Sequence, residues 1–503
     1  MTVELQSIPE LLAQRASATP DKVFLFSQAD KRKFTYREFA EAVGRTAGML
    51  AAKGIRKGDV VSLLLPNSVE YVIAYFACWQ LGALAGPVNA LLKSQEIEYV
   101  VSNSEAKLML VNSEFLAQVE RIEIPHVVFD SESETGKKFK KEKTNQSTAQ
   151  DELTAQDDAI IIYTSGTTGK PKGCLLTHEN IIANARQIST WLGFTENDRL
   201  LTVMPLFHMN AVSVTTMSAL YGGGSTVVCP KFSASRFWQI ISDYQITSFG
   251  SVATMLSMLL STYPDGVPEG LKTDQLRFAM CGSAPVPAEV LHRFEETFAC
   301  LVVEGYGLSE STCRSTFNPP DERRRPGSCG LPIGNEMRVV DEDDREVPDG
   351  EWGEIVLRGE NILKGYFKNE AATATAFRNG WFHTGDIAYR DADGYYYIVD
   401  RKSDMIIRAG ENIYPREIDE VLYQHPQILA AAVIGVPDEL YGEEVAAVVV
   451  LKPNATTSEQ EVIDFCKARL ADYKCPKTVR FVEDIPKGPT GKLLKRELQQ
   501  MFR

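Results

Sequence analysis

The chain has 503 residues, of which 44% are hydrophobic and 24% are charged, and its net charge is −14. This length predicts more than one domain, and the acidic balance argues against a nucleic-acid-binding protein, because such proteins are normally basic. The nine cysteines include no C-x-x-C pair, so neither a zinc site nor a disulfide framework is indicated.

The first 130 residues alternate helix-like and strand-like patterns. The opening stretch, MTVELQSIPELLAQRA, lacks the basic flank and apolar core of a signal peptide, so we expect a cytoplasmic protein. Alternation of this kind is typical of a parallel α/β sheet. The expected elements are a helix at 35–53, a strand at 60–65, a helix at 71–81, a strand at 84–88, a helix at 95–103 and a strand at 107–111.

Residues 71–92 contain no charged side chain and are long enough for a membrane span. Gln80, Gly82 and Pro87 interrupt this segment, so a buried helix followed by a short strand is the better interpretation. We therefore expect no integral membrane segment. Residues 131–157 are polar and charged, which predicts a flexible surface connection.

An apolar strand expected at 159–163 leads into the loop Thr164–Gly173, with the sequence TSGTTGKPKG. Glycines that let a ligand come close, hydroxyl groups and two lysines in one loop are suited to bind a polyphosphate. The loop is not a Walker A motif, because Pro171 stands where that motif requires its second glycine. The segment YTSGTTGKPKG closely resembles the phosphate loop of the acyl-adenylate-forming superfamily, which includes acyl-CoA synthetases, firefly luciferase and the adenylation domains of peptide synthetases.

Further segments match this superfamily in chain order, so the resemblance covers nearly the whole chain. It implies an AMP-forming acid–thiol ligase that uses ATP, Mg²⁺ and CoA. The matching segments read LTVMPLFHMNAV at 201–212, AMCGSAPVPA at 279–288, VEGYGLSESTCRS at 303–315, WFHTGDIAY at 381–389, DRKSD at 400–404, RAGENIYP at 408–415 and GPTGKLLKREL at 488–498.

The resemblance also implies which residues bind the nucleotide. Tyr306 would stack on the adenine, and Ser309 would contact a phosphate oxygen. Glu310 would hold Mg²⁺, since a hard cation prefers carboxylate and phosphate oxygens. Asp386 would accept hydrogen bonds from both ribose hydroxyls, with Arg401 beside it. The implied cofactor-binding set comprises Gly410, in a loop that would face the CoA thiol tunnel, and, for the nucleotide, Thr164, Ser165, Gly166, Thr167, Thr168, Lys172, Gly282, Ser283, Ala284, Glu304, Gly305, Tyr306, Gly307, Ser309, Asp386 and Arg401.

Lys492 stands in a turn-like segment before an expected helix, where local sequence alone indicates a helix-start charge. The resemblance implies instead that this lysine binds the acid and the α-phosphate, where a preorganised cation stabilises the charge of the transition state. The implied catalytic residues are Lys492, Thr164, Glu310 and His208.

The implied acyl pocket is lined by His208, Asn210, Val214, Cys281, Cys313 and Arg314. Segment 208–214 contains no acid that could pair with an amino group, which argues against an α-amino acid substrate. Arg314 leaves two alternatives open, because burying an unpaired charge is unfavourable. Either its side chain points away from the pocket, or the acid carries a second polar or anionic group. The acid itself stays open among fatty, aromatic and small polar acids.

The predicted fold is α/β, with a large N-terminal domain of parallel sheets at 1–400, which includes a small β subdomain at 326–400, and a mobile C-terminal α+β domain at 401–503. The resemblance implies that rotation of this domain about Ser403 would admit CoA to the acyl-adenylate. Within the C-terminal domain we expect a helix at 416–426, strands at 428–437 and 444–452, and a helix at 458–471.

The predicted function is ATP-dependent acid–CoA ligation. One alternative is an adenylation-only enzyme that passes the acyl group to a carrier protein, and another is a nucleotide-binding sensor without catalysis. The sequence leaves the oligomeric state open, with a homodimer as one alternative.

Overall fold

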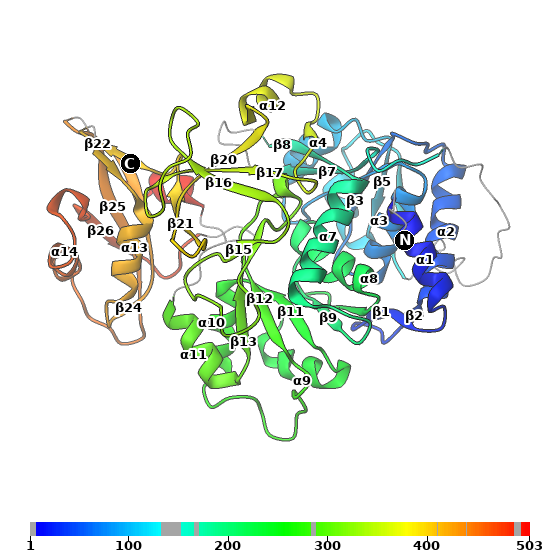
Figure 1. The fold of residues 1–503 in the computed structure, drawn as a ribbon, viewed down its shortest axis with the longest axis horizontal. Helices are drawn as coiled ribbons and strands as arrows, with labels where there is room; N and C mark the ends of the chain where they lie inside the picture. Colours follow the sequence, from blue (N-terminus) through cyan, green and yellow to red (C-terminus); the bar gives the residue numbers. More distant parts are fainter. Residues whose placement is uncertain are drawn as a thin grey trace.

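The computed structural model describes residues 7–131, 152–164, 171–282, 288–409, 411–438, 440–486 and 494–502. The large N-terminal domain occupies the right and centre of Figure 1, and the smaller C-terminal domain lies at the left. The predicted α/β class, with parallel sheets and a separate C-terminal domain, is confirmed. Most of the connection predicted at 131–157 lies outside the described residues.

The first seven-stranded sheet carries the strands that lead into the predicted acyl-pocket segments. In spatial order these are β13 (Leu301–Glu304), β12 (Phe278–Cys281), β11 (Ser248–Ser251), β9 (Arg199–Thr202), β10 (Ser225–Val228), β1 (Val23–Ser27) and β2 (Lys33–Thr35). Neighbours are parallel except β1 and β2. Because Cys281 pairs with Glu304 at the ends of β12 and β13, the segments that follow both strands leave the sheet at the same edge.

The second seven-stranded sheet carries the phosphate-loop strand. The predicted alternation between residues 35 and 111 is confirmed, with boundaries shifted by at most two residues. Its strands in spatial order are β18 (Gly365–Tyr366), β8 (Lys172–Thr177), β7 (Asp158–Thr164), β4 (Leu84–Pro87), β3 (Val60–Leu64), β5 (Leu108–Val111) and β6 (His126–Val128). The longer helices next to its strands in the sequence are α2 (Tyr36–Ala52), α3 (Val69–Gln80), α4 (Ser94–Asn103) and α7 (His178–Leu192).

Local sequence explains the start of α2 and the burial of α3. The Thr35 hydroxyl accepts a hydrogen bond from the Glu38 backbone amide at 3.2 Å, and the Glu38 carboxylate accepts one from the Thr35 amide at 2.8 Å, which is a capping box. Nearly all side chains of α3 are buried, and Trp79 Nε1 donates to the carbonyl of Ala159 at 2.9 Å. No helix in the described part of the chain is long and apolar enough to cross a membrane.

The phosphate-loop strand β7 turns back into an antiparallel partner, β8. The expected strand at 159–163 is confirmed, but the predicted loop bounds were wrong. Thr164 still belongs to β7 and pairs with Lys172 of β8, because the hairpin register extends through both residues. Gly173 also lies in β8, where a Cβ atom would stand 3.0 Å from the Ile161 side chain, so its role is close packing rather than loop freedom. A strand-to-strand hairpin also differs from the strand-to-helix loop of a Walker A motif.

A five-stranded antiparallel sheet occupies most of the predicted β subdomain. Its strands are β16 (Glu336–Val340), β17 (Gly353–Arg358), β19 (Phe377–Arg378), β20 (Trp381–Arg390) and β21 (Tyr396–Arg401). Two strands within the predicted range 326–400 pair elsewhere: β15 (Leu331–Pro332) pairs with β14 (Thr316–Phe317), and β18 pairs with β8 of the second seven-stranded sheet. This crossing places Tyr366 beside the phosphate-loop hairpin.

The C-terminal domain has its own hydrophobic core around a sheet that is buried on both faces. Alternate residues of its long strands point into separate apolar clusters, which explains the continuous apolar sequence of these strands. The predicted elements are confirmed, although the last predicted helix ends four residues early at Lys467. The elements are β22 (Ile406–Arg408), β23 (Glu411–Ile413), α13 (Pro415–Tyr423), β24 (Ile428–Asp438), β25 (Gly442–Leu451), α14 (Glu459–Lys467), β26 (Thr478–Phe481) and α15 (Lys495–Gln500).

The proposed boundary at residue 401 falls at the end of β21. Across it, the Arg416 backbone amide donates to Asp400 at 3.0 Å, and the rings of Trp352 and Tyr414 meet at 5.1 Å between centroids. These contacts join the C-terminal domain to the β subdomain.

Candidate active site

Three predicted nucleotide-binding side chains meet at the junction of the first sheet and the β subdomain. Asp386 of β20 pairs in register with Arg401 of β21, and Arg401 Nε lies 3.0 Å from Asp386 Oδ1. Tyr306, just after β13, donates its hydroxyl to Asp386 Oδ2 at 2.6 Å. Each carboxylate oxygen of Asp386 therefore has a partner, and the residue is only 3% exposed.

The charges of this cluster support one another. Burial raises the pKa of Tyr306 well above its usual value, and the neighbouring Asp386 carboxylate raises it further, so the phenol stays a hydrogen-bond donor. Burial would lower the pKa of Arg401, but Asp386 and Tyr306 raise it overall. Such a carboxylate is a double acceptor suited to a vicinal diol.

A second group of polar side chains surrounds Glu310 on the short 3₁₀ helix η3 (Ser309–Ser311). Glu310 Oε1 accepts a hydrogen bond from the Tyr366 hydroxyl at 3.1 Å and lies 3.5 Å from Thr164 Oγ1. Lys172 Nζ lies 5.3 Å from the centre of the Tyr366 ring. The structure thus brings Thr164, Lys172 and Glu310 together around Tyr366.

Tyr366 is a residue of this group that sequence reasoning missed. Its only local signal is an aromatic residue in the short segment Gly365–Phe367. The long-range pairing of β18 with β8 gives it its position. The Glu310 carboxylate adds to the effect of burial in raising the pKa of Tyr366, which keeps the phenol protonated.

The residues around Glu310 fit a magnesium ion that is bound together with phosphate. No group of three or more His, Cys, Asp or Glu residues in the described ranges could hold a metal ion by itself. Glu310 supplies one hard carboxylate, and Mg²⁺ usually takes one or two carboxylates and completes its coordination with phosphate oxygens and water.

Part of the predicted site lies outside the described residues, and its roles stay predictions. These residues are Ser165, Gly166, Thr167, Thr168, Ser283, Ala284, Gly410 and Lys492. Ser309 is described, as the first residue of η3.

The glycines of the predicted adenine segments are required by packing within the protein. A Cβ atom on Gly282 would lie 2.6 Å from the Gly305 carbonyl oxygen and 2.7 Å from Arg314 Nη2. On Gly305 it would lie 2.5 Å from the Phe317 ring, and on Gly307 it would lie 2.0 Å from the Cys313 carbonyl oxygen. The segments after β12 and β13 therefore touch each other through their glycine positions.

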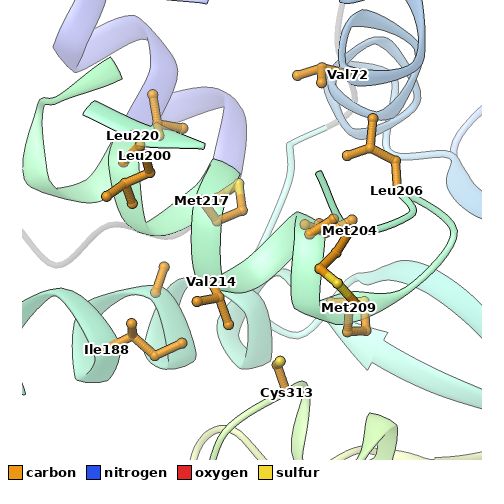
Figure 2. Close-up of a cluster of buried hydrophobic side chains, with 14 of the residues drawn as sticks. Val72, Ile188, Leu200, Met204, Leu206, Met209, Val214, Met217, Leu220 and Cys313 are labelled. Carbon is orange, nitrogen blue, oxygen red and sulfur yellow. The ribbon is translucent and has the colours of Figure 1, made fainter. Parts of the chain in front are cut away.

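The predicted acyl-pocket residues cluster between this edge and the π-helix η2 (Asn210–Met217). Val214, Cys281 and Cys313 are buried, and Figure 2 shows Val214 and Cys313 with Met209 in one apolar cluster. Asn210 is buried with neither side-chain oxygen nor nitrogen hydrogen-bonded in the described structure. The residues predicted for the acyl pocket therefore combine apolar side chains with a polar group that has no hydrogen-bond partner among the described residues.

His208 precedes η2 and offers hydrogen bonding without charge. Its Nε2 atom is buried and has no hydrogen-bond partner among the described residues. Burial lowers the pKa of His208 to about 4, so the imidazole is neutral near pH 7. The ring can donate or accept a hydrogen bond there but cannot act as a counter-ion.

Arg314 follows η3 and is almost completely buried, with 2% of its surface exposed. Its Nη1 donates to the Cys313 carbonyl at 3.3 Å, whereas Nε and Nη2 have no partner in the described structure. The sequence gives little warning of this burial, because arginine is rarely buried without a partner.

Glu304 ends β13 with a buried carboxyl group that is 7% exposed. Its Oε2 accepts a hydrogen bond from the Gly327 amide at 3.0 Å. Burial raises the pKa of Glu304 to about 7, although this hydrogen bond and nearby Arg324 oppose the rise. The carboxyl group thus keeps its proton at pH values where an exposed glutamate has lost it.

We expect replacement of Glu304 by Gln to flatten the pH dependence of stability. In the unfolded chain Glu304 loses its proton near its ordinary pKa, whereas the folded protein holds it until about pH 7. Wild-type stability should therefore fall, relative to the variant, as pH rises from about 4.5 to 7, by on the order of 3 kcal/mol. Denaturant unfolding of both proteins at pH 5 and pH 8 measures this. Equal pH dependence in the two proteins would contradict the assignment.

Comparison with known proteins agrees with this geometry. The family model described as AMP-binding enzyme matches residues 12–367, and the model described as AMP-binding enzyme C-terminal domain matches residues 417–492. Sulfoacetate–CoA ligase of Cupriavidus necator is 36% identical over 98% of this chain and 97% of its own length. Oxalate–CoA ligase of Arabidopsis thaliana is 35% identical, and long-chain-fatty-acid–CoA ligase FadD13 of Mycobacterium tuberculosis is 36% identical, each over 99% of both chains.

Solved structures show the same similarity. ATP-bound MatB from Rhodopseudomonas palustris superposes with a TM-score of 0.90 at 30% identity, over 99% of both chains. O-succinylbenzoate coenzyme A synthetase (MenE) from Bacillus subtilis, in complex with ATP and magnesium ion, gives a TM-score of 0.85 at 34% identity, over 97% of this chain and 99% of that one. The predicted superfamily is confirmed: the chain belongs to the AMP-binding enzyme family, in its acid–CoA ligase branch.

Proposed function

We propose that this chain adenylates a carboxylic acid with Mg·ATP and then transfers the acyl group to CoA. The observation that supports this most is the convergence of Asp386 with Arg401 and Tyr306, and of Glu310 with Thr164, from segments far apart in the sequence. These side chains offer an acceptor for a ribose diol and a carboxylate for a hard cation, which together suit a nucleotide bound with Mg²⁺.

In the first step a carboxylate oxygen of the acid attacks the α-phosphorus of ATP, and pyrophosphate leaves. In the second step the CoA thiol attacks the acyl carbon of the adenylate, loses its proton, and AMP leaves. Asp386 would orient the ribose, Glu310 would hold Mg²⁺, and Lys492 would stabilise charge on the α-phosphate. Bound Mg²⁺ would neutralise phosphate charge. Neutral His208 would hydrogen-bond the reacting carboxylate without adding charge.

Transfer to CoA is favoured over transfer to a carrier protein. The full-length relatives named above are CoA ligases, and no observation points to a carrier protein. Their acids differ, because sulfoacetate and oxalate each carry a second anionic group and a long-chain fatty acid does not. The names of the relatives therefore do not identify the class of acid, which must be inferred from the residues predicted to line the acyl pocket of this chain.

The test is to incubate the purified protein with Mg·ATP and a panel of acids, with and without CoA, and to identify products by mass spectrometry. The panel spans aliphatic, aromatic, dicarboxylic and sulfonated acids. We expect acyl-CoA and AMP in equal amounts for at least one acid. Acyl-adenylate that accumulates unchanged by CoA would support the adenylation-only alternative. ATP binding without release of pyrophosphate would support the sensor.

A further inference from the structure

The guanidinium group of Arg314 is a buried positive charge that the described protein does not neutralise. Arginine stays protonated in proteins, so burial cannot remove this charge. No carboxylate among the described residues forms an ion pair with it, and its Nε and Nη2 donors are unsatisfied. The nearest aromatic face, Phe317, lies 5.5 Å from Cζ. A buried charge of this kind is normally paired, which indicates that a partner is supplied from outside the chain.

The main chain of Arg314 is anchored, so the guanidinium group is presented from a fixed point. Asn184 of α7 donates to the Arg314 carbonyl at 2.6 Å, and Asn184 Oδ1 accepts from the Arg314 amide at 3.3 Å. Ser213 of η2 donates to the same Asn184 oxygen at 3.0 Å, and Asn361 donates to the Arg314 carbonyl at 3.3 Å. Anchoring in advance lowers the entropy that a ligand contact would otherwise cost.

The free guanidinium nitrogens lie at the predicted acyl pocket. Nη2 approaches the Cβ position of Gly282, directly after pocket residue Cys281. The Asn210 side chain, from η2, approaches Gly250 of β11. Strand β11 lies next to β12, where Gly250 pairs with Met280. Arg314 and Asn210 thus present polar groups without partners among the described residues at the same sheet edge, whereas neutral His208 supplies no charge there.

We propose that the acyl pocket selects acids that carry a second anionic group, carboxylate or sulfonate, and that the Arg314 guanidinium binds this group while the first carboxylate is adenylated. The inference rests on the proposed ligase function and names its substrate class. A planar guanidinium with free donors matches either anion. Asn210 would complete the contact through its amide.

The experiment compares the wild type with Arg314→Met, which keeps the length of the side chain and removes its charge. Each is assayed for acyl-CoA with a short dicarboxylate, the sulfonated acid of the same length, and a monocarboxylic acid of that length that has no second anionic group. We expect the variant to lose at least about 100-fold in kcat/KM for the preferred dianion, because a buried charge pair loses one partner. The ratio between dicarboxylate and sulfonate in the wild type identifies the anion.

Arg324→Met is the matched control. Arg324 is a largely buried arginine of the same region, but it is already paired with Glu295 at 2.7 Å. Its loss should lower stability and leave the preference for dianions unchanged. Arg314→Met should melt no lower than the wild type without acid, since it removes a buried charge that has no ion-pair partner among the described residues. If Arg314 has only a structural role, that variant melts lower and keeps its acid preference, which would overturn the proposal.

A binding measurement separates this inference from the ligase function. The preferred dianion should raise the melting temperature of the wild type and not that of Arg314→Met. If no acid yields acyl-CoA but this stabilisation is seen, the ligase function fails and the anion site stands. If monoacids are ligated equally well by both proteins, the function stands and the anion site fails. The anion site is also wrong if Arg314→Met changes neither the stabilisation by the dianion nor the preference among acids.

Discussion

Replacement of Asp386 by Ala is expected to lower kcat/KM for ATP by about 10²–10⁴-fold. The variant loses the only acceptor pair proposed for the ribose diol, and hydrogen bonds to a charged group contribute about 1.5–3 kcal/mol each. It also leaves the half-buried Arg401 and the Tyr306 hydroxyl without the carboxylate they now share. Steady-state kinetics with varied ATP measure the loss. Asp386→Asn, which keeps one acceptor oxygen, should lie between the two proteins.

The control for this prediction is Asp391→Ala. Asp391 lies in the turn between β20 and β21 and pairs with Arg325 at 2.8 Å, so the variant breaks an acid–arginine pair of the same sheet. It should lower the melting temperature without changing KM for ATP. If Asp386→Ala binds ATP as the wild type does, the ribose assignment is wrong.

Replacement of Lys492 by Ala should slow adenylation by about 10²–10³-fold, because it removes a preorganised cation from the α-phosphate. Thioester formation from a supplied acyl-adenylate should change much less, since that step builds no charge on phosphorus. Pyrophosphate release measures the first half-reaction, and acyl-CoA formation from synthetic adenylate measures the second. The two rates must be obtained separately on the same preparation.

Lys474→Ala serves as the comparison for Lys492→Ala. Lys474 belongs to the same domain and pairs with Glu417 at 2.7 Å. The variant therefore removes a lysine of the C-terminal domain that lies outside the proposed site. Both half-reactions should stay near wild type in this variant. Equal losses in both half-reactions of Lys492→Ala would show that the lysine has another role.

Much of the N-terminal fold follows from local sequence. The apolar strands and the helices between residues 35 and 111 alternate in the sequence, and the structure reproduces this alternation with boundaries shifted by at most two residues. The residues that lie near Asp386 and near Glu310 could be predicted only because the motifs resemble those of a known superfamily. Spacing alone could not have placed Asp386 beside Tyr306, which lies 80 residues earlier.

Long-range pairing and burial account for what sequence could not supply. Tyr366 lies beside Glu310 because β18 pairs with β8, which is far from it in the sequence. A strand of two residues is too short to show the alternation from which a strand is predicted. The hairpin end at Thr164 and Lys172 is set by register with a partner strand. The position of the Arg314 side chain could not be predicted from sequence, because a charged residue is normally exposed, whereas Arg314 is 2% exposed.

Arg401 ends β21, two residues before the proposed pivot Ser403, while its side chain holds the carboxylate assigned to the ribose. The nucleotide contact and the start of the C-terminal domain are therefore almost the same point of the chain. If nucleotide affinity differs between the orientations of that domain, linkage requires that ATP and AMP shift its orientation by the same factor. Substitutions at the contact between Asp400 and Arg416 should then change nucleotide affinity without touching the nucleotide.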